Sequence, residues 1–419
     1  MSFTALKPVL TPEGWELLNS LPPYDASASA ELNKRLRKEG WDPETTAAAL
    51  TQSQLRAEAR GKFGEFADRM LLTREGLQQS TRLPAAARHA SRFRDAGAKH
   101  VADLGCGLGG DSMAFAAAEL AVTAVEADET TAAAATINLR PFPEAQVVQA
   151  TAEAFLETAS RVRGVWLDPA RRDERRGRSG GSAARLWDPE EFSPPLSFVT
   201  DLAATGVPLG VKLGPGIPHE LIPDGCEAEW VSIDGELVEV VLWFNDLARP
   251  GVRRAATALS TGNGAVRTAE LTASSSFGKG IDPEPAGREG FSGILWEPDP
   301  AVIRAGLVAE LAEKLGAHLL DEHIAYLCGS GAHNDGAQQL ARGHRILDVQ
   351  EFKPKALKRW ASQEGVTSLE IRKRGVDVVP EQLRRQLLTG RRRTKAPVHR
   401  DLVITRIGEE RLVAVVEPL

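Results

Sequence analysis

A chain of 419 residues is too long for one ordinary hydrophobic core, so two or three domains are expected. Hydrophobic residues make up 42% and charged residues 26%, a balance typical of globular proteins. No stretch approaches the roughly 18 apolar residues of a membrane span. The three cysteines lie far apart, with no CxxC spacing, which predicts a reducing, cytoplasmic location and implies no metal.

The net charge of −6 conceals an asymmetry between the two ends of the chain. Residues 341–400 hold 16 Lys and Arg against 6 Asp and Glu, a net +10 that leaves −16 for the remainder. A basic end on an acidic body favours an anionic partner for that end. A solvated basic surface is the alternative, and the composition leaves both open.

Residues 1–97 are predicted to form a small helical domain. Thr11-Pro12-Glu13 and Asp42-Pro43-Glu44 each place a capping oxygen before a proline at the first helical position. Thr51 and Gln54 have the spacing of a capping box, which predicts another helix start.

Residues 98–246 are predicted to form an α/β domain, because short apolar runs alternate with helical segments there. The expected parallel strands are 100–105, 121–127, 145–150, 164–169 and 208–214, with helices such as 129–139 and 196–205 between them. Two further strands, 228–235 and 236–244, meet at Asp234-Gly235, a hairpin signal. A parallel sheet ending in an antiparallel hairpin is typical of the Rossmann-like class I methyltransferase fold.

Residues 247–419 are predicted to form a C-terminal α+β domain. Its first part is rich in Gly, Ser, Thr and Ala, which indicates strands mixed with turns. An amphipathic pattern over 300–316 predicts one long helix. The remaining expectations are a strand over 368–378, a helix over 380–390 and final strands over 401–407 and 411–418.

A glycine-rich turn follows the first predicted strand, in the run Asp103-Leu104-Gly105-Cys106-Gly107-Leu108-Gly109. Glycines there allow a ligand to approach the backbone closely. The GxGxG spacing suits a compact ligand that carries an amino acid better than a pyrophosphate, which favours S-adenosylmethionine. Asp103 could meet the ammonium of the methionine moiety, and Glu126, at the end of the next strand, could accept both ribose hydroxyls.

The third strand ends at Thr151, where an acid normally binds the adenine amine. A hydroxyl cannot accept a charge-assisted hydrogen bond as a carboxylate does, so the backbone or Glu153 is the alternative adenine contact. The candidate cofactor-binding residues are Asp103, Gly105, Cys106, Gly107, Gly109, Asp111, Glu126, Ala127 and Thr151.

The fourth strand ends in Asp168-Pro169-Ala170-Arg171, close to the Asp/Asn-Pro-Pro-aromatic run of amine methyltransferases. A carboxylate and a proline carbonyl can accept the two hydrogens of an exocyclic amine and direct its nitrogen toward the methyl group. Asp168, Pro169 and Arg171 are therefore the candidate catalytic residues, with Arg171 stacking on a base or pairing with a phosphate. A simple capped strand end is the alternative.

Cationic residues surround this point of the sequence. The segment 171–185 holds six Arg around a Gly-Ser centre, which predicts a mobile loop suited to nucleic acid. Lys212 ends the fifth strand and is a second candidate for substrate contact.

Taken together, the chain resembles bacterial class I methyltransferases with a C-terminal THUMP-like domain, of the actinobacterial type. The resemblance covers nearly the whole chain and rests on residues 59–81, VADLGCGLGGD, WLDPARRD, VKLGPG, GELVEVVLWF, ILWEPDPAVIRAGLV, IAYL and LEIRKRGVDV. It implies an S-adenosylmethionine-binding fold, an RNA substrate and packing of the segment Leu77–Thr81 over the cofactor loop.

The favoured hypothesis is methylation of a base exocyclic amine in structured RNA, either tRNA or rRNA. One alternative is an RNA-binding module that keeps the fold without transferring a methyl group, which the missing aromatic residue and Thr151 favour. Another is a small-molecule or protein methyltransferase, which the cationic surroundings of the predicted site disfavour.

Overall fold

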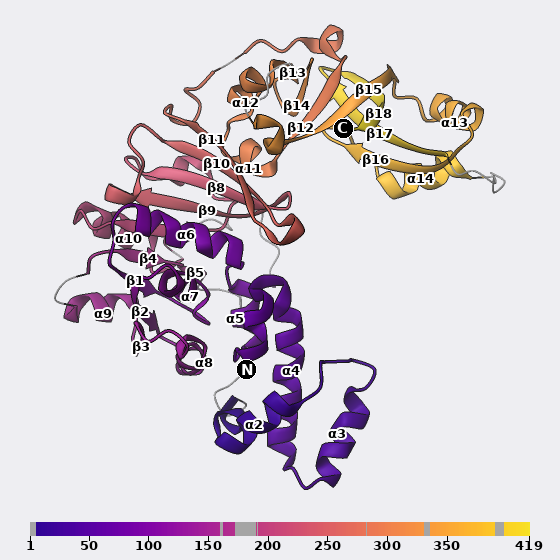
Figure 1. Ribbon diagram of the computed structural model, residues 1–419. Helices are drawn as coiled ribbons and strands as arrows, with labels where there is room; N and C mark the ends of the chain where they lie inside the picture. The colour runs from indigo at the N-terminus through magenta and orange to yellow at the C-terminus, as the bar shows by residue number, and fades with distance from the viewer. Residues whose placement is uncertain are drawn as a thin grey trace. The chain divides into compact units, whose positions relative to one another are not determined.

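The computed structural model describes residues 6–159, 162–171, 190, 192–281, 283–330, 336–389 and 398–419. Backbone contacts divide the chain into two compact units, which Figure 1 colours along the sequence. Unit 1 comprises Met1–Glu227 and Glu239–Pro250, and unit 2 comprises Ala228–Val238 and Gly251–Leu419. Within the described part of the chain, no helix is long and apolar enough to cross a membrane.

The first part of unit 1 is helical, as predicted. Its helices are α2 (Pro12–Ser20), α3 (Ser29–Lys38), α4 (Pro43–Phe63), α5 (Arg74–Gln79) and α6 (Leu83–Asp95). Thr11 and Asp42 cap α2 and α4 as expected, because their side-chain oxygens accept backbone N–H bonds of the first turn. The capping box predicted at Thr51 and Gln54 is wrong: both lie inside α4, where the Thr51 hydroxyl donates to the carbonyl of Ala47.

The remainder of unit 1 contains the predicted sheet, in the order β9-β7-β4-β1-β2-β3. The strands are β1 (His100–Leu104), β2 (Ala121–Glu126), β3 (Ala145–Gln149), β4 (Val165–Leu167), β7 (Leu209–Leu213) and β9 (Glu236–Phe244). The pairs β1–β2, β1–β4, β2–β3 and β4–β7 are parallel, which confirms the prediction. The other elements are α7 (Gly110–Ala117), α8 (Glu129–Leu139), α9 (Ala152–Thr158), β5 (Ala170–Arg171), β6 (Phe192–Ser193) and α10 (Leu196–Ala204).

The predicted antiparallel end of the sheet is also present. Strand β9 runs antiparallel to β7. It is joined to β8 (Glu227–Ile233) by the two-residue turn Asp234-Gly235, whose φ angles are 52° and 80°. Both residues therefore take the left-handed conformation that a tight hairpin turn requires.

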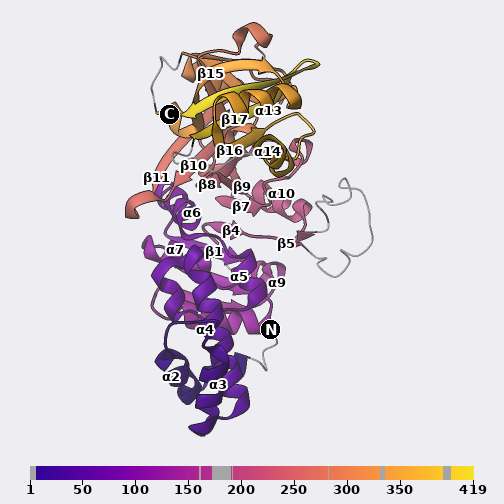
Figure 2. The ribbon, with the colours of Figure 1, turned by 90° about the vertical axis from the view of Figure 1, so that its right-hand side faces the viewer.

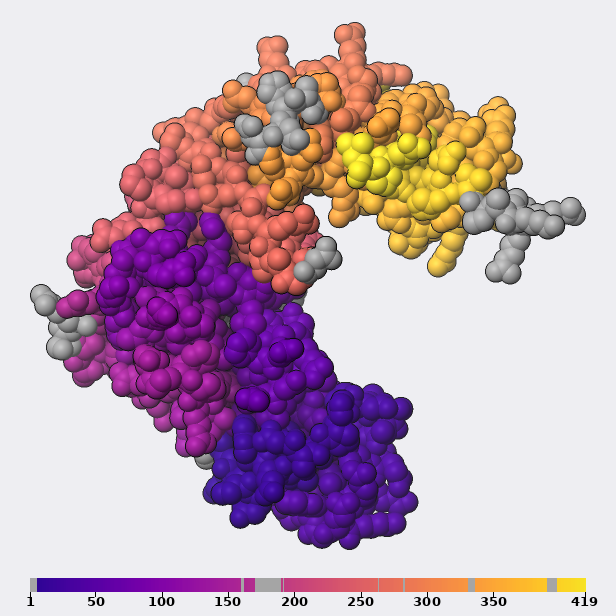
Figure 3. All heavy atoms as spheres, in the orientation of Figure 1, coloured from indigo at the N-terminus to yellow at the C-terminus, as the bar shows by residue number. Residues whose placement is uncertain are grey.

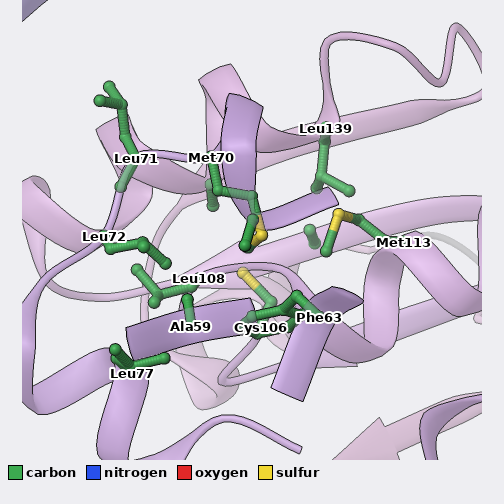
Figure 4. Packing of buried hydrophobic residues seen from close by; sticks show 14 of the residues in the cluster. Ala59, Phe63, Met70, Leu71, Leu72, Leu77, Cys106, Leu108, Met113 and Leu139 are labelled. Carbon is green, nitrogen blue, oxygen red and sulfur yellow. The ribbon is translucent and has the colours of Figure 1, made fainter. Parts of the chain in front are cut away.

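One hydrophobic core joins the helical segment to the sheet. Phe63 of α4, Met70, Leu72, Leu108 and Leu139 pack together in Figure 4 and belong to the same buried cluster. In the space-filling view the purple atoms of the helical segment adjoin the magenta atoms of the α/β part (Figure 3). The helices before residue 97 are thus packed onto the sheet.

Asn138 connects the helical segment to the glycine-rich turn through hydrogen bonds. Its amide oxygen accepts from Leu71 N at 2.7 Å. Its amide nitrogen donates to Leu71 O at 3.0 Å and Leu108 O at 2.9 Å. Because Asn138 is buried, these bonds satisfy polar groups that water does not reach.

Unit 2 contains β8, β10 (Arg254–Ser260) and β11 (Arg267–Ala273), in which β10 is parallel to β8 and antiparallel to β11. Its second sheet has the order β13-β14-β12-β15-β18-β17-β16. These strands are β12 (Ile294–Pro298), β13 (Ala317–Asp321), β14 (Ile324–Gly329), β15 (Ala341–Glu351), β16 (Val366–Lys373), β17 (Val398–Ile407) and β18 (Glu410–Pro418).

The described part of unit 2 also contains four α-helices. They are α11 (Pro300–Arg304), α12 (Val308–Leu315), α13 (Pro354–Gln363) and α14 (Pro380–Leu388). The single helix predicted over 300–316 is wrong, because Gly306 takes a φ of 66° and separates α11 from α12. Helices α13 and α14 lie together against β16 and β17 (Figure 2) and bury Leu357 and Leu387 there.

Candidate functional site

A cavity of about 1020 Å³ opens in unit 1 at the carboxyl ends of the parallel strands. Ligands of open parallel sheets bind at this edge. Its walls come from the ends of β1, β2, β4 and β7, from the start of α9 and from residues 73–81. Most of the predicted site residues line it, namely Asp103, Gly105, Cys106, Gly107, Asp111, Glu126, Ala127, Thr151, Asp168 and Pro169.

The glycine-rich turn has the backbone that its sequence predicts. Gly105, Gly107 and Gly109 have φ angles of 90°, 56° and 84°, which side chains rarely adopt. A Cβ atom at Gly105 would also lie 3.3 Å from the carbonyl oxygen of Asp168. Glycine therefore permits the end of β4 to approach the turn closely.

Residues 76–81 pack over this turn, as the resemblance implied. A Cβ atom at Gly76 would lie 2.8 Å from Leu108 Cγ, so only glycine leaves room for the turn. Leu77 is buried, and the Thr81 hydroxyl donates to Asp111 at 2.7 Å. The segment before α6 therefore completes the wall of the cavity.

Asp103 lies at the end of β1, before the glycine turn, and is hydrogen-bonded to α7. Asp103 accepts from the Ser112 hydroxyl at 2.5 Å and is almost fully buried. Burial, and then the charge of Asp111, raise the pKa of the Asp103 carboxyl well above its usual range. An ammonium group bound in the cavity would favour the ionised form of Asp103.

Glu126 faces the cavity with both carboxylate oxygens in use. One accepts from Gly107 N at 3.0 Å and the other from Asp128 N at 2.8 Å. Burial raises the pKa of the Glu126 carboxyl, and the backbone N–H bonds oppose that rise. Each oxygen keeps a further lone pair, so the predicted acceptance of ribose hydroxyls is compatible with this geometry.

Asp111 is held from two sides in a buried network that the sequence did not reveal. His89 Nδ1 lies 2.8 Å from one Asp111 oxygen, and His89 Nε2 lies 2.8 Å from Glu239. Burial opposes protonation of His89, but Glu239 first, and then Asp111, raise its pKa to about 9. With a carboxylate at each ring nitrogen, His89 is an imidazolium at neutral pH.

Lys212 occupies the position between this network and Asp168. Its ammonium lies 2.5 Å from Asp168 Oδ2 and donates to the Thr81 hydroxyl at 2.9 Å. Burial would lower the pKa of Lys212, but Asp168 and then Asp111 raise it above its usual value. Lys212, predicted as a substrate contact, is thus tied to Asp168, and its side chain is only 12% exposed.

Of the remaining predicted residues, Thr151 lines the cavity and Gly109 does not. The Thr151 hydroxyl caps α9 by accepting from Ala154 N at 3.2 Å, and Glu153 also lines the cavity. Gly109 is the N-cap residue of α7, and a Cβ atom there would lie 3.3 Å from Leu139 Cγ. The side chain of Arg171 and the arginine-rich segment 172–185 lie outside the described residues.

Comparison with known proteins identifies the family to which this chain belongs. Two Mycobacterium tuberculosis proteins, from strains CDC 1551 and H37Rv, are each 34% identical over 366 residues. The matches cover 84% of this chain and 91% of the relatives, which are uncharacterized S-adenosylmethionine-dependent methyltransferases. The chain belongs to the S-adenosylmethionine-dependent methyltransferases.

Further comparisons agree with this methyltransferase assignment. The crystal structure of a candidate methyltransferase from Porphyromonas gingivalis W83 superposes with a TM-score of 0.72 and covers 95% of this chain and 100% of its own. At 18% identity this likeness establishes the fold. Residues 341–418 match a THUMP domain-like family, and residues 2–59 match a domain of unknown function.

The cofactor of this methyltransferase is S-adenosylmethionine, and the cavity fits it. The left-handed glycine turn exposes backbone at the end of β1, and Glu126 stands at the end of β2. Acidic side chains, rather than an anion-binding set of donors, line this part of the cavity. That lining suits a ligand with a sulfonium and an ammonium group.

Glu126→Ala should weaken S-adenosylmethionine binding by about 1–3 kcal/mol, the cost of removing charge-assisted hydrogen bonds to buried hydroxyls. Calorimetry checks this, and NADH should not bind in the same assay. Glu157→Ala, on the last turn of α9 and outside the cavity lining, is the matched control. Unchanged affinity in Glu126→Ala would remove the ribose assignment.

Proposed function

We propose that this methyltransferase modifies a base exocyclic amine in structured RNA, either tRNA or rRNA. The main support for this proposal is the position of Asp168, whose carboxylate lines the cavity beside the glycine turn. Among the described residues only Lys212 pairs with it, through Oδ2. Oδ1 therefore has acceptor capacity for a substrate N–H.

The chemistry follows from what Asp168 can accept. When bound, S-adenosylmethionine supplies an electrophilic methyl group. A carboxylate that accepts one amine hydrogen holds the nitrogen in place and opposes delocalisation of its lone pair into the base. The methylated nitrogen must lose a proton, and Asp168 is the acceptor in reach. The carbonyl oxygen of Pro169 is proposed to accept the second hydrogen.

The proposal that the substrate is RNA is supported by features of unit 2. The THUMP domain-like match covers the stretch of highest positive charge, and its helix α13 exposes Lys355, Lys358 and Arg359. Their i, i+3, i+4 spacing places them on one side of α13, opposite the buried Leu357 and Ala361. We propose that this basic face contacts RNA phosphates.

A second candidate function is RNA binding without methyl transfer. Two observations favour it. Arg171 stands where amine methyltransferases carry the aromatic residue that stacks on the base, and the Thr151 hydroxyl is engaged in capping α9. A cytoplasmic location, predicted from cysteine usage, stays a prediction.

Nucleoside analysis of RNA from a strain that lacks the protein tests the proposed function. One nucleoside methylated on an exocyclic amine should disappear from tRNA or rRNA and return when the wild-type chain is restored. An RNA-binding module without catalysis would leave all methylated nucleosides in place. A methyltransferase for small molecules or proteins would also leave them unchanged.

Replacing Lys355, Lys358 and Arg359 with alanine should weaken RNA binding and flatten its salt dependence, because fewer counterions are released. Cofactor affinity should not change. Lys34, Arg37 and Lys38 of α3 have the same spacing and exposure, and their alanine variant is the matched control. If the affinity for RNA does not depend on salt, the basic face of α13 is only a solvated surface and does not contact RNA phosphates. The same prediction applies to Arg391–Arg393, which lie outside the described residues.

A further inference from the structure

Asp168 stands at one end of a continuous chain of polar contacts in unit 1. This series of contacts begins with the Asp168–Lys212 ion pair and passes through the Thr81 hydroxyl to Asp111. It continues through His89 and ends at Glu239 of β9. Six different parts of unit 1 contribute to it, namely the end of β4, β7, the segment before α6, α6 itself, α7 and β9.

The chain alternates in charge along its length. Carboxylates at Asp168, Asp111 and Glu239 are separated by the cations Lys212 and His89. Apart from Asp168, whose side chain is 31% exposed, all charged members are at most 12% exposed by side chain. A buried charge is tolerated only when it is paired and hydrogen-bonded, so each member depends on its neighbours.

The far end of the chain is anchored by packing. The His89 ring lies 4.2 Å from the Trp166 ring and 6.2 Å from the Trp243 ring, centroid to centroid. Both tryptophans are fully buried. His89 therefore has little freedom to move, and the positions of Asp111 and Thr81 are fixed from that side.

We propose that Lys212 is the positioning residue of the methyl-transfer site, holding one oxygen of Asp168 so that the carboxylate stays ionised and presents its other oxygen to the substrate amine. This inference rests on the proposed function of Asp168. Thr81 fixes the ammonium in turn, since it accepts from Lys212 while donating to Asp111.

The charged groups around Asp168 explain why its carboxylate needs Lys212 to stay ionised. The groups that face Asp168 are Lys212 of β7, Asp111 of α7, Glu239 of β9 and Asp103 of β1. Partial burial raises the pKa of the Asp168 carboxyl, and Asp111 and Glu239 raise it further. Among the described residues, Lys212 is the group that lowers it. Without the ammonium, Asp111 and Glu239 would favour the protonated form of Asp168, which cannot accept an amine hydrogen at that oxygen.

The first test needs neither cofactor nor substrate. The carboxyl of Asp168 is followed by NMR in protein labelled with ¹³C at aspartate, and Asp168→Asn identifies its signal. Lys212→Met should move the titration midpoint of Asp168 to higher pH, while Lys212→Arg should leave it near that of the wild type. Lys99→Met, at the exposed residue before β1, is the matched control. An unchanged midpoint in Lys212→Met would overturn the inference.

The second test measures turnover, cofactor affinity and the pH profile. Lys212→Met should bind S-adenosylmethionine nearly as the wild type does, yet lose at least about 10-fold in kcat. The acidic limb of its profile should move to higher pH, and Lys212→Arg should recover much of the loss. If cofactor affinity falls by the same factor as turnover and the acidic limb stays in place, Lys212 binds the cofactor and the inference is wrong.

Failure of the proposed function would give a different pattern. Asp168→Asn would then methylate RNA as the wild type does, or RNA would not be methylated at all. The NMR midpoint would still report whether Lys212 controls Asp168. The double variant Asp168→Asn with Lys212→Met removes both charges of the pair, so its thermal unfolding separates loss of the pair from loss of the fold.

Discussion

Asp168→Ala should reduce the turnover of RNA methylation by on the order of 100-fold or more, the effect of removing one well-placed polar group from a preorganised site. The protein should still fold and bind S-adenosylmethionine. The reason lies in the sheet: β1 ends at the glycine turn, β4 ends at Asp168, and the two strands pair directly. Asp168 therefore lines the cavity, at the place where we propose that substrate approaches.

Cofactor affinity separates this effect from a general loss of structure. Asp168→Ala leaves Lys212 without its carboxylate, so some loss of stability is expected as well. Asp168→Asn keeps the shape of the side chain and one acceptor oxygen. It should therefore be less destabilised than Asp168→Ala, but its turnover should still be slow. Asp201→Ala, on the exposed side of α10, is the matched control and should be fully active. Wild-type turnover in Asp168→Ala would contradict the amine mechanism.

The free energy of unfolding should fall as the pH rises from 6.5 to 9, because of His89. Its pKa is raised from 6.5 to about 9 in the folded protein by Glu239 and Asp111, against the opposing effect of burial. The folded state therefore keeps a proton that the unfolded state releases above pH 6.5. The stabilisation is complete below pH 6.5 and is lost by about pH 9, with an upper limit of about 3 kcal/mol.

Urea unfolding at a series of pH values measures this dependence. His89→Gln should be less stable than the wild type near neutral pH and should lack most of the decline between pH 6.5 and 9. Glu239→Gln should show a smaller decline, since one of the two carboxylates remains. The exposed His323→Gln is the matched control. Burial lowers the pKa of His100 and of His344, so their contributions lie below pH 6.5 and have the opposite sign. Equal slopes in His89→Gln and wild type would contradict the imidazolium assignment.

Local sequence patterns predicted the elements that position the cofactor. The apolar run 100–105 became β1, the segment 129–139 became α8 with the same bounds, and the glycine turn has the left-handed backbone expected of it. These features are local, since alternation, capping and φ preference act within a few residues. The same reasoning failed at Gly306, because helical periodicity alone does not show where one helix ends and another begins.

The polar network could not be predicted because its members are far apart in sequence. His89 and Glu239 are separated by 150 residues. His89 lies outside the motifs identified in the sequence, and Glu239 lies in GELVEVVLWF, where nothing indicated a polar partner. A lone histidine or glutamate in an apolar segment carries no signal until the fold brings a partner to it. Lys212 was visible as a polar residue at a strand end, but its pairing with Asp168 depends on the neighbouring positions of β4 and β7.

Transfer of a radiolabelled methyl group from S-adenosylmethionine tests the central claim most directly. The substrate is bulk RNA from a strain that lacks the protein, which leaves the target site unmodified. Label should enter RNA with the wild-type chain and should be lost with Asp168→Ala, and digestion should place it on a base exocyclic amine. Bound cofactor with no label in RNA, or label in protein or small molecules instead, would contradict the claim that this methyltransferase acts on RNA.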